Sequence, residues 1–441
     1  MMETNIDKTK ERLDLWCSPQ DVAFETPQAE QDYRQRTRRI SDAIQLKVPD
    51  RVPISPLVTF FPARYSGNTA QEMMYDPDKA YEAFKKVALD FQWDTAMNHI
   101  NTLSGPMLEE LDYKQLRWPG HGVPPDRSYQ FVEAEYMKAD EYDAFLDDPT
   151  GFMIRTYLPR ICGTLAPFQL LPPLTMVFPY YVGLMLMIGN VAMSGAASAF
   201  ESIIRAQEKF INLAMSVGIF NGEMQSLGFP ILMGGTTQAP FDTLGDSLRG
   251  TQGIMLDMYR QPDKLLKALD KLLPSAIDMA VVSSAMALSP VIFIPLHKGA
   301  RGFMSRKQFE TFYWPTLHKL MLALIDKGLV PMPCFESDYS DRLDIIKDIP
   351  AGKAIYWFEK TDICKAKEVL GDRVCLKGNV PSSIMCTGTP EQVREYCKKL
   401  IDVAGKNGGL IVDGDVGIPD EAKVENVRAM TDFVKEYGVY K

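Results

Sequence analysis

Short apolar runs that end in polar residues recur along the C-terminal third of the chain. Four such runs are residues 330–335, 354–358, 374–376 and 410–412. The polar residues that follow them include Glu336, Glu359, Asn379 and Asp415. Segments of roughly ten to twenty residues with helical spacing lie between the runs. This alternation predicts buried parallel strands, each followed by a helix.

Four earlier runs bring the number of predicted strands to eight: residues 52–58, 94–98, 229–233 and 291–296. The first two are weaker, because Pro53 and Pro56 interrupt one and the other is only half apolar. Eight parallel strands with intervening helices predict an α/β fold, a (β/α)8 TIM barrel whose strand ends meet at one mouth. We expect this barrel, with insertions, over residues 51–441, after an N-terminal helical arm at residues 1–50.

Composition narrows the classes of partner. The net charge is −9 and no long basic block occurs, which argues against nucleic acid as a partner. Seven cysteines without CxxC spacing indicate a reduced, cytoplasmic setting. The first residues have no apolar core, so no signal peptide is expected.

Residues 161–200 contain no charged side chain. Their second half, residues 180–200, is long enough to span a bilayer, which takes about twenty residues. Pro167, Pro172, Pro173 and Pro179 break the first half, and no basic cluster closely flanks the segment. We therefore expect no membrane partner, and a segment that is buried in a core, a lid or the subunit contact of a homo-oligomer.

Metal-ligating residue types fall at or near the predicted strand ends. They are Cys334 or Glu336 after the fifth strand, Cys375 in the seventh and Asp415 after the eighth. Zinc accepts sulfur, nitrogen and carboxylate oxygen, and residues from different barrel strands can supply them without a local motif. Because cysteine is among the most buried residue types, a purely structural role for Cys375 is the alternative.

Two of the four histidines, His99 and His297, close predicted strands. A histidine there is either a hydrogen-bonded wall residue or an acid–base group at the mouth. GxGxxG, Walker, GxSxG and HExxH patterns are absent from plausible places, which argues against nucleotide-dependent and serine-hydrolase chemistry.

Three motifs carry a family resemblance. They are Val374-Cys-Leu-Lys-Gly-Asn-Val-Pro381, Gly388-Thr-Pro-Glu-Gln-Val393 and Glu425-Asn-Val427. Together they resemble the uroporphyrinogen decarboxylase superfamily, over roughly residue 291 to the C-terminus and more loosely before it. The resemblance implies a TIM barrel. It also implies one of two activities, because the superfamily contains porphyrinogen decarboxylases and methyltransferases that exchange methyl groups with corrinoid proteins.

The decarboxylase branch clamps substrate carboxylates with an arginine-rich motif at the first strand. Only Arg64-Tyr65 resembles the end of that motif here, and Phe60 and Phe61 stand where the family has polar groups. Aromatic side chains suit an apolar or aromatic substrate better than a polyanion. The branch's Gly-His-Gly near the last strand is Gly414-Asp-Val416. The resemblance therefore argues against porphyrinogen decarboxylation.

Thiol-activating methyltransferases of the other branch carry zinc on His-x-Cys after the fifth strand and on a cysteine after the eighth. Here those positions read Pro333-Cys334-Phe335-Glu336 and Asp415. The resemblance implies a harder zinc site of Glu336, Cys375 and Asp415, with Cys334 as the substitute for Glu336. Such a site suits polarisation of an ether oxygen better than formation of a thiolate.

We therefore expect a methyltransferase that cleaves a small methylated donor, an aryl methyl ether, and passes the methyl group to cob(I)alamin on a separate corrinoid protein. His297 and Asp338 are the predicted catalytic residues. The predicted substrate contacts are Phe60, Phe61, His99, Tyr339, Trp357 and Asn379. The alternative is a metal-independent decarboxylase of a smaller carboxylate, and a non-enzymatic barrel scaffold is the third option.

Overall fold

A parallel sheet of six strands forms the centre of the protein, seen here in a computed structural model that describes residues 7–177 and 180–441. The strand order is β4-β5-β6-β7-β8-β9, and every neighbouring pair is parallel. The strands are β4 (Met233–Thr236), β5 (Val291–Leu296), β6 (Val330–Phe335), β7 (Ile355–Phe358), β8 (Cys375–Lys377) and β9 (Leu410–Ile411). The parallel α/β class is confirmed, with β4 starting where its predicted run ended.

The first two predicted strands are not regular strands. They make single parallel bridges, Ile54 to Val412, Val58 to Ile418 and Ala96 to Ile231. The backbone N–H of Asp94 also donates to the carbonyl of Ile54 over 2.9 Å. Pro53 and Pro56 cannot donate to a ladder, which accounts for the interrupted pairing. The regular sheet is therefore not closed, and the predicted ring of eight strands is incomplete.

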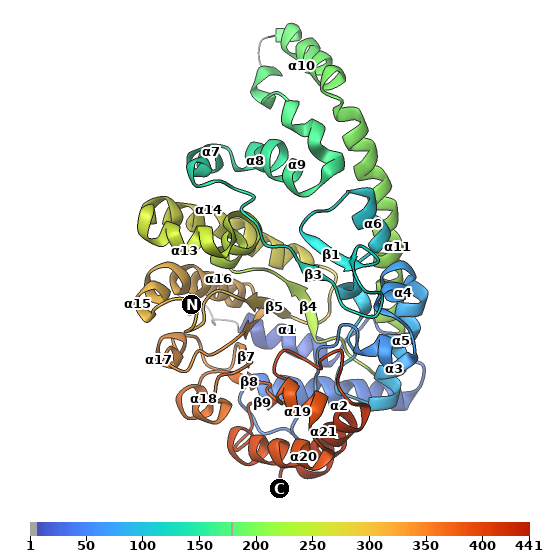
Figure 1. Cartoon of the computed structure of the whole chain (residues 1–441). Helices are drawn as coiled ribbons and strands as arrows, with labels where there is room; N and C mark the ends of the chain where they lie inside the picture. Colours follow the sequence, from blue (N-terminus) through green and yellow to red (C-terminus); the bar gives the residue numbers. More distant parts are fainter. Residues whose placement is uncertain (1–6, 178–179) are drawn as a thin grey trace, which may run out of the picture.

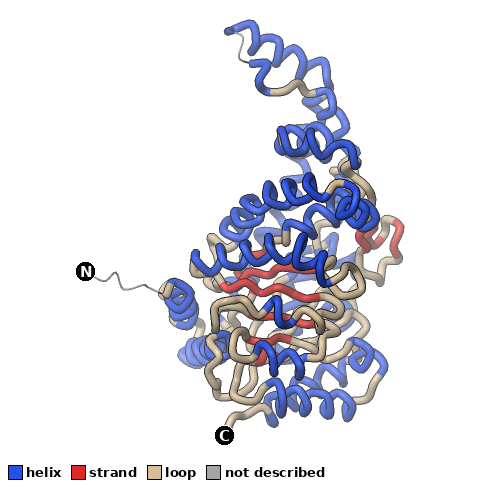
Figure 2. The backbone as a smooth tube through the Cα atoms, turned by 90° about the vertical axis from the view of Figure 1, so that its left-hand side faces the viewer, coloured by secondary structure: helices blue, strands red, loops and turns tan. Residues whose placement is uncertain are grey.

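Helices follow the strands and cover the outer side of the sheet (Figures 1 and 2). They are α12 (Pro240–Asp242), α13 (Gly250–Arg260), α14 (Pro262–Ser283), α15 (Arg306–Gln308), α16 (Trp314–Asp326), α17 (Leu343–Ile346), α18 (Ile363–Leu370), α19 (Ser382–Thr387), α20 (Pro390–Lys399) and α21 (Val424–Tyr437). The Gly-Thr-Pro-Glu motif starts α20. Thr389 and Gln392 form a reciprocal capping box around Pro390, which suits a first helical turn.

Two N-terminal helices, α1 (Lys8–Cys17) and α2 (Pro27–Ile44), pack against one end of the sheet. Their apolar side chains share one buried cluster with residues that begin strands, namely Leu13, Trp16, Tyr33 and Ile40 with Val291, Val330, Ile355 and Cys375. This cluster therefore marks the N-terminal ends of the strands. Three further helices follow: α3 (Phe61–Ser66), α4 (Ala70–Tyr75) and α5 (Pro77–Phe91).

A large insertion separates α5 from β4. It contains three short strands and six helices: α6 (Gly105–Glu110), β1 (Leu116–Pro119), β2 (Gly122–Val123), β3 (Gln130–Phe131), α7 (Tyr142–Asp147), α8 (Pro149–Phe152), α9 (Leu158–Ile161), α10 (Tyr180–Ser194) and α11 (Ala196–Ser226). Helix α10 and the adjoining part of α11 project away from the rest of the protein (Figures 1 and 2).

The uncharged segment is covered in part: Ile161, Cys162, Leu165 and Phe168 lie in a buried cluster, whereas most of α10 is exposed, so burial of α10 in a core or lid of this chain is wrong. Tyr181, Met185 and Met193 of α10 are 78%, 68% and 88% exposed. In the described residues no single helix is long and apolar enough to cross a membrane. The pair 181–194 and 196–226, bent by 74°, meets that length and composition together.

A fully buried ion pair joins β8 to the residue after β9. The ammonium of Lys377 contacts the carboxylate of Asp413 and lies 3.6 Å from the ring centre of Trp357. Burial lowers the pKa of Lys377 and raises that of Asp413 to about 6, and their mutual attraction opposes both shifts. Asp413 also accepts the backbone N–H of Leu57, so it ties the first segment to the sheet.

Replacing Lys377 by methionine is expected to lower the free energy of unfolding by about 3–5 kcal/mol, because it leaves the Asp413 carboxylate buried without its partner. Denaturant titration measures the change. The paired variant Lys377→Met/Asp413→Leu should recover much of the loss, because both charges are then absent. Arg394→Met, which removes an exposed pair with Glu391, is the control. An unchanged unfolding free energy in Lys377→Met would contradict this interpretation of the pair.

Candidate functional site

His297 and Glu336 lie side by side at the C-terminal ends of β5 and β6. The register of these strands places Leu296 opposite Phe335, so the next residue of each strand falls at the same edge. His297 Nε2 is 3.5 Å from Glu336 Oε1. The predicted convergence of strand-end residues is thus confirmed for these two.

Two aspartates from the segment after β4 complete the group. Asp242 ends α12 and is fully buried, and Asp246 lies one helical turn later in a π-helical turn, Thr243–Arg249. Asp242 accepts the backbone N–H groups of His297 and Lys298 over 3.2 and 2.8 Å. Asp246 Oδ2 is 2.6 Å from His297 Nδ1. We call Asp242, Asp246, His297 and Glu336 the His297 array.

Outer residues hold both aspartates in place. The Tyr313 hydroxyl donates to Asp242 Oδ2, and the Gln238 amide donates to Asp246 Oδ2 over 2.8 Å. Lys298 Nζ lies 3.0 Å from Asp246 Oδ1 and donates to Glu133 over 3.2 Å. Each carboxylate is therefore fixed by groups on other elements, which preorganises the array.

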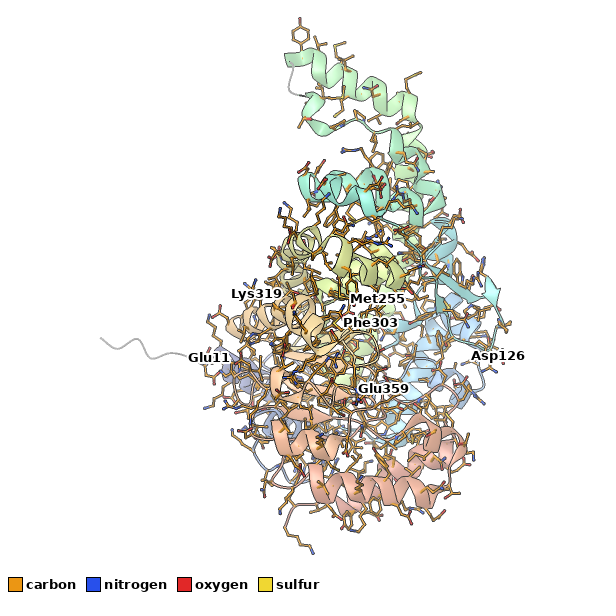
Figure 3. The ribbon with its side chains drawn as sticks, turned by 60° about the vertical axis from the view of Figure 1, so that its left-hand side comes forward. Glu11, Asp126, Met255, Phe303, Lys319 and Glu359 are labelled. Carbon is orange, nitrogen blue, oxygen red and sulfur yellow. The ribbon has the colours of Figure 1, made fainter. Side chains whose placement is uncertain are left out.

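Two further residues flank the array. Phe303 has the ammonium of Lys298 5.4 Å from its ring centre, and Glu359 follows β7 directly and adds negative charge near Glu336 (Figure 3). The site thus collects carboxylates from the segments after β4, β6 and β7, around the histidine that follows β5. In a parallel sheet of this kind, that edge is where ligands bind.

The charges of the array set its protonation. Burial raises the pKa of Asp242 to about 7, and the nearby Asp246 charge adds to this. Burial opposes ionisation of Asp246 too, but the hydrogen bond and charge of His297 outweigh it and lower the pKa of that carboxyl. For His297, burial alone would lower the pKa. The Asp246 hydrogen bond and the surrounding carboxylates outweigh burial and raise it to about 9.

A protonated His297 at neutral pH donates from both ring nitrogens. Nδ1–H is taken by Asp246, whereas Nε2–H points toward Glu336 over a longer separation. The side chains of His297 and Glu336 are 38% and 36% exposed, so a ligand can reach this end. Burial raises the pKa of Glu336, and the imidazolium partly offsets the rise. The array can therefore deliver a proton to a bound molecule.

The zinc ligands expected from the sequence are not brought together. Cys375 begins β8 and lies in the apolar cluster at the opposite end of the strands, where burial raises the pKa of its thiol to about 12. Asp415 accepts the backbone N–H and hydroxyl of Ser382 over 2.8 and 2.5 Å. Cys334, the substitute ligand, is buried, and this raises its pKa well above the usual value. A thiolate at either cysteine is unfavourable.

A different group could hold a metal ion. Within the described residues, Asp242, Asp246 and His297 have ligand atoms within 4.8 Å of one another, and two carboxylates with one imidazole suit several divalent metals. However, both oxygens of Asp242 and both of Asp246 already face hydrogen-bond donors, and Lys298 places an ammonium beside Asp246. This bonding pattern fits a proton on His297 better than a metal ion.

Three other predicted residues, Asp338, His99 and Asn379, lie apart from the array. Asp338 bonds to Ser340 and is 3.9 Å from Arg301 on the exposed loop after β6. His99 is fully buried beside Phe84 and Phe220, 2.9 Å from the Ser216 hydroxyl, and burial lowers its pKa to about 4. The chain turns into a 3₁₀ helix, His99–Thr102, at this point, which directs the imidazole toward α5 and α11.

Asn379 joins two loops. Its amide donates to the carbonyls of Glu359 and Thr361 over 2.9 and 3.1 Å, and the Tyr396 hydroxyl donates to its oxygen. Both the amide N–H groups and the oxygen of Asn379 are thus hydrogen-bonded within the protein. The Gly-Asn motif therefore positions the loop that carries Glu359.

The predicted aromatic substrate wall is not assembled. Phe60 lines a small cavity of about 210 Å³ with Arg64 and Asp420. The other three rings, Phe61, Tyr339 and Trp357, are each at most 1% exposed. They stabilise the core and do not face the array's open end.

Asp242, Asp246, Lys298 and Glu133 were missed in the sequence. Two aspartates four residues apart after Pro240, in the helical segment that follows a predicted strand, share one helical face. That spacing was the available signal. Glu133 has no such signal, because it reaches Lys298 from a segment more than a hundred residues away.

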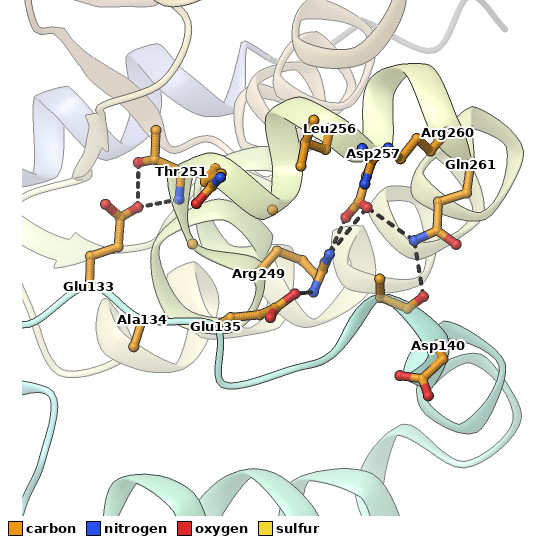
Figure 4. Close-up of a pocket in the computed structure, with 14 residues that line it drawn as sticks. Glu133, Ala134, Glu135, Asp140, Arg249, Thr251, Leu256, Asp257, Arg260 and Gln261 are labelled. Atoms are coloured by element: carbon orange, nitrogen blue, oxygen red, sulfur yellow. Dashed lines mark hydrogen bonds and ion pairs between the residues drawn. The ribbon is translucent and has the colours of Figure 1, made fainter.

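A cavity of about 780 Å³ lies next to Lys298, and no residue of the His297 array lines it (Figure 4). Glu133 and Thr251 line it, and both bond to Lys298, so the cavity and the array share one wall. Its buried Arg249 is already paired with Glu135 and Asp257 over 2.5 and 2.6 Å. The volume is in the usual range for small-molecule sites.

Comparison with known proteins places the C-terminal half in a family. The family model described as uroporphyrinogen decarboxylase (URO-D) matches residues 216–437. Among similar proteins is a uroporphyrinogen decarboxylase of Mannheimia succiniciproducens, 26% identical over 223 residues, which are 49% of this chain and 60% of the relative. One from Chlorobium phaeovibrioides is 30% identical over 141 residues, 30% of this chain and 38% of the relative. The chain thus spans 60% and 38% of the lengths of these two relatives, less than two thirds of either.

A solved structure matches almost the whole chain. A methyltransferase from Methanosarcina mazei superposes with a TM-score of 0.59 and 16% sequence identity, over 91% of this chain and 98% of the other. At this identity the match concerns the fold. It extends the similarity through the N-terminal half, where the family model does not reach.

Proposed function

Because this chain belongs to the uroporphyrinogen decarboxylase family, we propose that it is a methyltransferase of that family. It takes the methyl group of a small methylated donor, an aryl methyl ether, and passes it to cob(I)alamin carried by a separate corrinoid protein. The fold shared with a methyltransferase from Methanosarcina mazei supports this choice within the family.

The observation that carries the proposal is the chemistry of the His297 array. Its cations in the described structure are His297 and Lys298, and no arginine bonds to it there. Carboxylates dominate instead, with Asp242, Asp246 and Glu336 around one imidazolium. Such a site repels a polycarboxylate and suits an uncharged substrate whose leaving oxygen needs a proton.

The step balances as a methyl transfer. The methyl carbon leaves the ether oxygen, and that oxygen keeps the bonding electron pair and takes a proton from His297 Nε2. The electron pair of the new cobalt–carbon bond comes from cob(I)alamin, which supplies a two-electron nucleophile when bound. The products are a phenol and methylcobalamin. Asp246 holds the imidazole in position, and solvent returns the proton at the exposed edge.

The residues around the array hold the imidazole of His297 in place. Asp242 fixes the backbone of the loop after β5 through two N–H groups, and the bond from Nδ1 to Asp246 holds the imidazole ring itself. Glu336 adds a negative charge that keeps the imidazolium protonated. The corrinoid protein must dock where this edge is open, because cobalamin is far larger than the donor.

A panel of methylated donors tests the proposal. Purified protein, cob(I)alamin and each donor are incubated without oxygen, and the loss of the cob(I)alamin spectrum is followed. We expect turnover with at least one aryl methyl ether. The rival activity is decarboxylation of a smaller carboxylate, which the names of the curated relatives favour. Carbon dioxide release from small carboxylates, with no methyl transfer, would support that rival.

Metal removal is a separate prediction. We expect the protein to keep its methyl-transfer activity after dialysis against a chelator. The reason is that the protonated His297 and Lys298 already neutralise and bond to Asp246. Elemental analysis of protein purified without chelator measures the metal content. Stoichiometric zinc that is lost together with activity, and restored by added zinc, would contradict this. It would instead assign Asp242, Asp246 and His297 as ligands of a Lewis-acid zinc.

A further inference from the structure

The projecting hairpin has one arm in residues 163–177 and the other in α10 with the first part of α11, residues 181–204 (Figures 1 and 2). The second arm carries apolar side chains that the described chain leaves exposed, namely Tyr181, Met185, Ile188, Met193 and Ile204, which are 55% to 88% exposed. Contiguous exposed apolar surface on this scale marks an interaction site.

The distribution of these side chains decides what covers them. At about 100° per residue, the exposed apolar side chains of α10 occupy an arc of roughly 200°. A helix that packs on one partner needs an apolar stripe of roughly 100°. One face of a second copy would therefore cover about half of the arc. A lipid environment covers all of it.

The length of the hairpin fits one leaflet. Helix α10 has 15 residues, which gives it a length of about 22 Å. One leaflet contributes about half of a hydrocarbon core of roughly 30 Å. The helix is thus long enough to enter one leaflet, and the segment Leu174–Val177 that packs along it belongs to the other arm of the hairpin.

The charged side chains lie outside the part of the hairpin that would enter the leaflet. Residues 161–200 carry no charge, whereas Arg205 pairs with Glu110 of α6 over 2.6 Å at the base of the hairpin. Within the apolar part, the hydroxyls of Ser194 and Ser198 donate to carbonyls of their own turns over 2.9 and 2.8 Å. Hydroxyls that are satisfied within the helix are tolerated in hydrocarbon.

We propose that this hairpin inserts into one leaflet of a lipid bilayer and holds the enzyme on the membrane surface. The expectation of no membrane partner came from the prolines of the first half and the missing basic flank, which argue against a spanning helix, and it left cover by protein as the alternative. The exposure of α10 shows that this chain does not supply that cover. Insertion is driven by the apolar surface and needs no anionic lipid, so it does not depend on ionic strength.

Flotation with vesicles of uncharged phosphatidylcholine tests the proposal on the full chain. We expect the wild-type protein to float with the vesicles in low and high salt. Met185→Asp/Ile188→Asp should lower the vesicle-bound fraction more than about tenfold, because carboxylates in hydrocarbon are costly. The control is Val282→Asp/Met286→Asp, which changes two side chains that are 74% and 98% exposed outside the hairpin, and it should float like the wild type.

A second measurement does not depend on the charged variant. Tyr181→Trp places an indole on the hairpin, and brominated acyl chains should quench its added fluorescence relative to ordinary vesicles. Wild-type protein that stays unbound, together with no added quenching in Tyr181→Trp, would overturn the proposal. If that protein formed dimers that Met185→Asp/Ile188→Asp dissociated, a second copy would be the occupant. Neither readout requires methyl transfer, so failure here is distinct from failure of the proposed function.

Discussion

Replacing His297 by glutamine is expected to lower kcat for methyl transfer by about two to four orders of magnitude, the usual contribution of a general acid. Glutamine keeps a polar side chain near Asp246 but cannot release a proton to the leaving oxygen. Asp246 would still face Lys298 and Gln238, and Asp242 would still face Tyr313, so the fold should persist. The rate of cob(I)alamin consumption at saturating donor measures the effect.

His318→Gln is the matched control, because His318 stacks on Trp314 away from the array. It should retain the wild-type rate. Full activity in His297→Gln, with an unchanged melting temperature, would show that the proton comes from elsewhere. Donors with more acidic leaving phenols should lose less rate in His297→Gln, since they depend less on protonation.

Asp246→Asn is expected to move the alkaline limit of the activity to lower pH. In the wild type the pKa of His297 is raised to about 9, so the acid form is present below that pH and activity is lost as the pH rises through it. Asparagine removes the charge and the charge-assisted hydrogen bond to Nδ1. Loss of one close opposite charge shifts a pKa by roughly one to three units. The pH dependence of kcat measures the displacement.

Glu133→Gln serves as its control, because Glu133 bonds to Lys298 and not to His297. Its alkaline limit should stay in place. Thermal stability gives a second readout with the same sign. The raised pKa stabilises the folded protein fully below the ordinary imidazole pKa near 6.5, and this contribution is lost as the pH rises through about 9. An alkaline limit in Asp246→Asn at the wild-type pH would contradict the assigned role of Asp246.

The sheet was predictable from sequence where apolar runs are uninterrupted. Strands β5, β6, β7 and β9 lie within the predicted runs and β8 extends one residue beyond its run, because buried parallel strands need apolar side chains on both faces. The run at residues 52–58 failed as a regular strand since Pro53 and Pro56 lack the donors that a ladder requires. Periodicity alone does not reveal this, and the segment makes only isolated bridges.

The site was predictable only in part, because the sequence does not always show at which end of a strand a residue lies. His297 and Glu336 directly follow long strands, so the C-terminal end was identifiable. Cys375 is the first residue of a strand of three residues. For so short a strand, the sequence does not show which residue lies at the N-terminal end and which at the C-terminal end. Its thiol therefore lies at the opposite end, within the apolar cluster. Asp246 was missed because a helix, and not a strand end, carries it to His297.

The hairpin shows a different limit of sequence reasoning. Absence of charge over residues 161–200 predicts cover by something apolar, and the prediction assumed that protein supplies it. The fold of this chain does not, because α10 projects beyond every other described element (Figure 1). Which partner covers an apolar helix depends on the width of its exposed arc, and that width depends on tertiary placement.

The most direct test of the central claim follows the methyl group itself. Purified protein is incubated without oxygen with cob(I)alamin and an aryl methyl ether that carries ¹³C in its methyl group, and the label is located by nuclear magnetic resonance. The account predicts ¹³C-methylcobalamin and one equivalent of free phenol, and His297→Gln should form both more slowly by about two to four orders of magnitude. Label that remains in the ether, for every aryl methyl ether tried, while the protein releases carbon dioxide from a small carboxylate would contradict it.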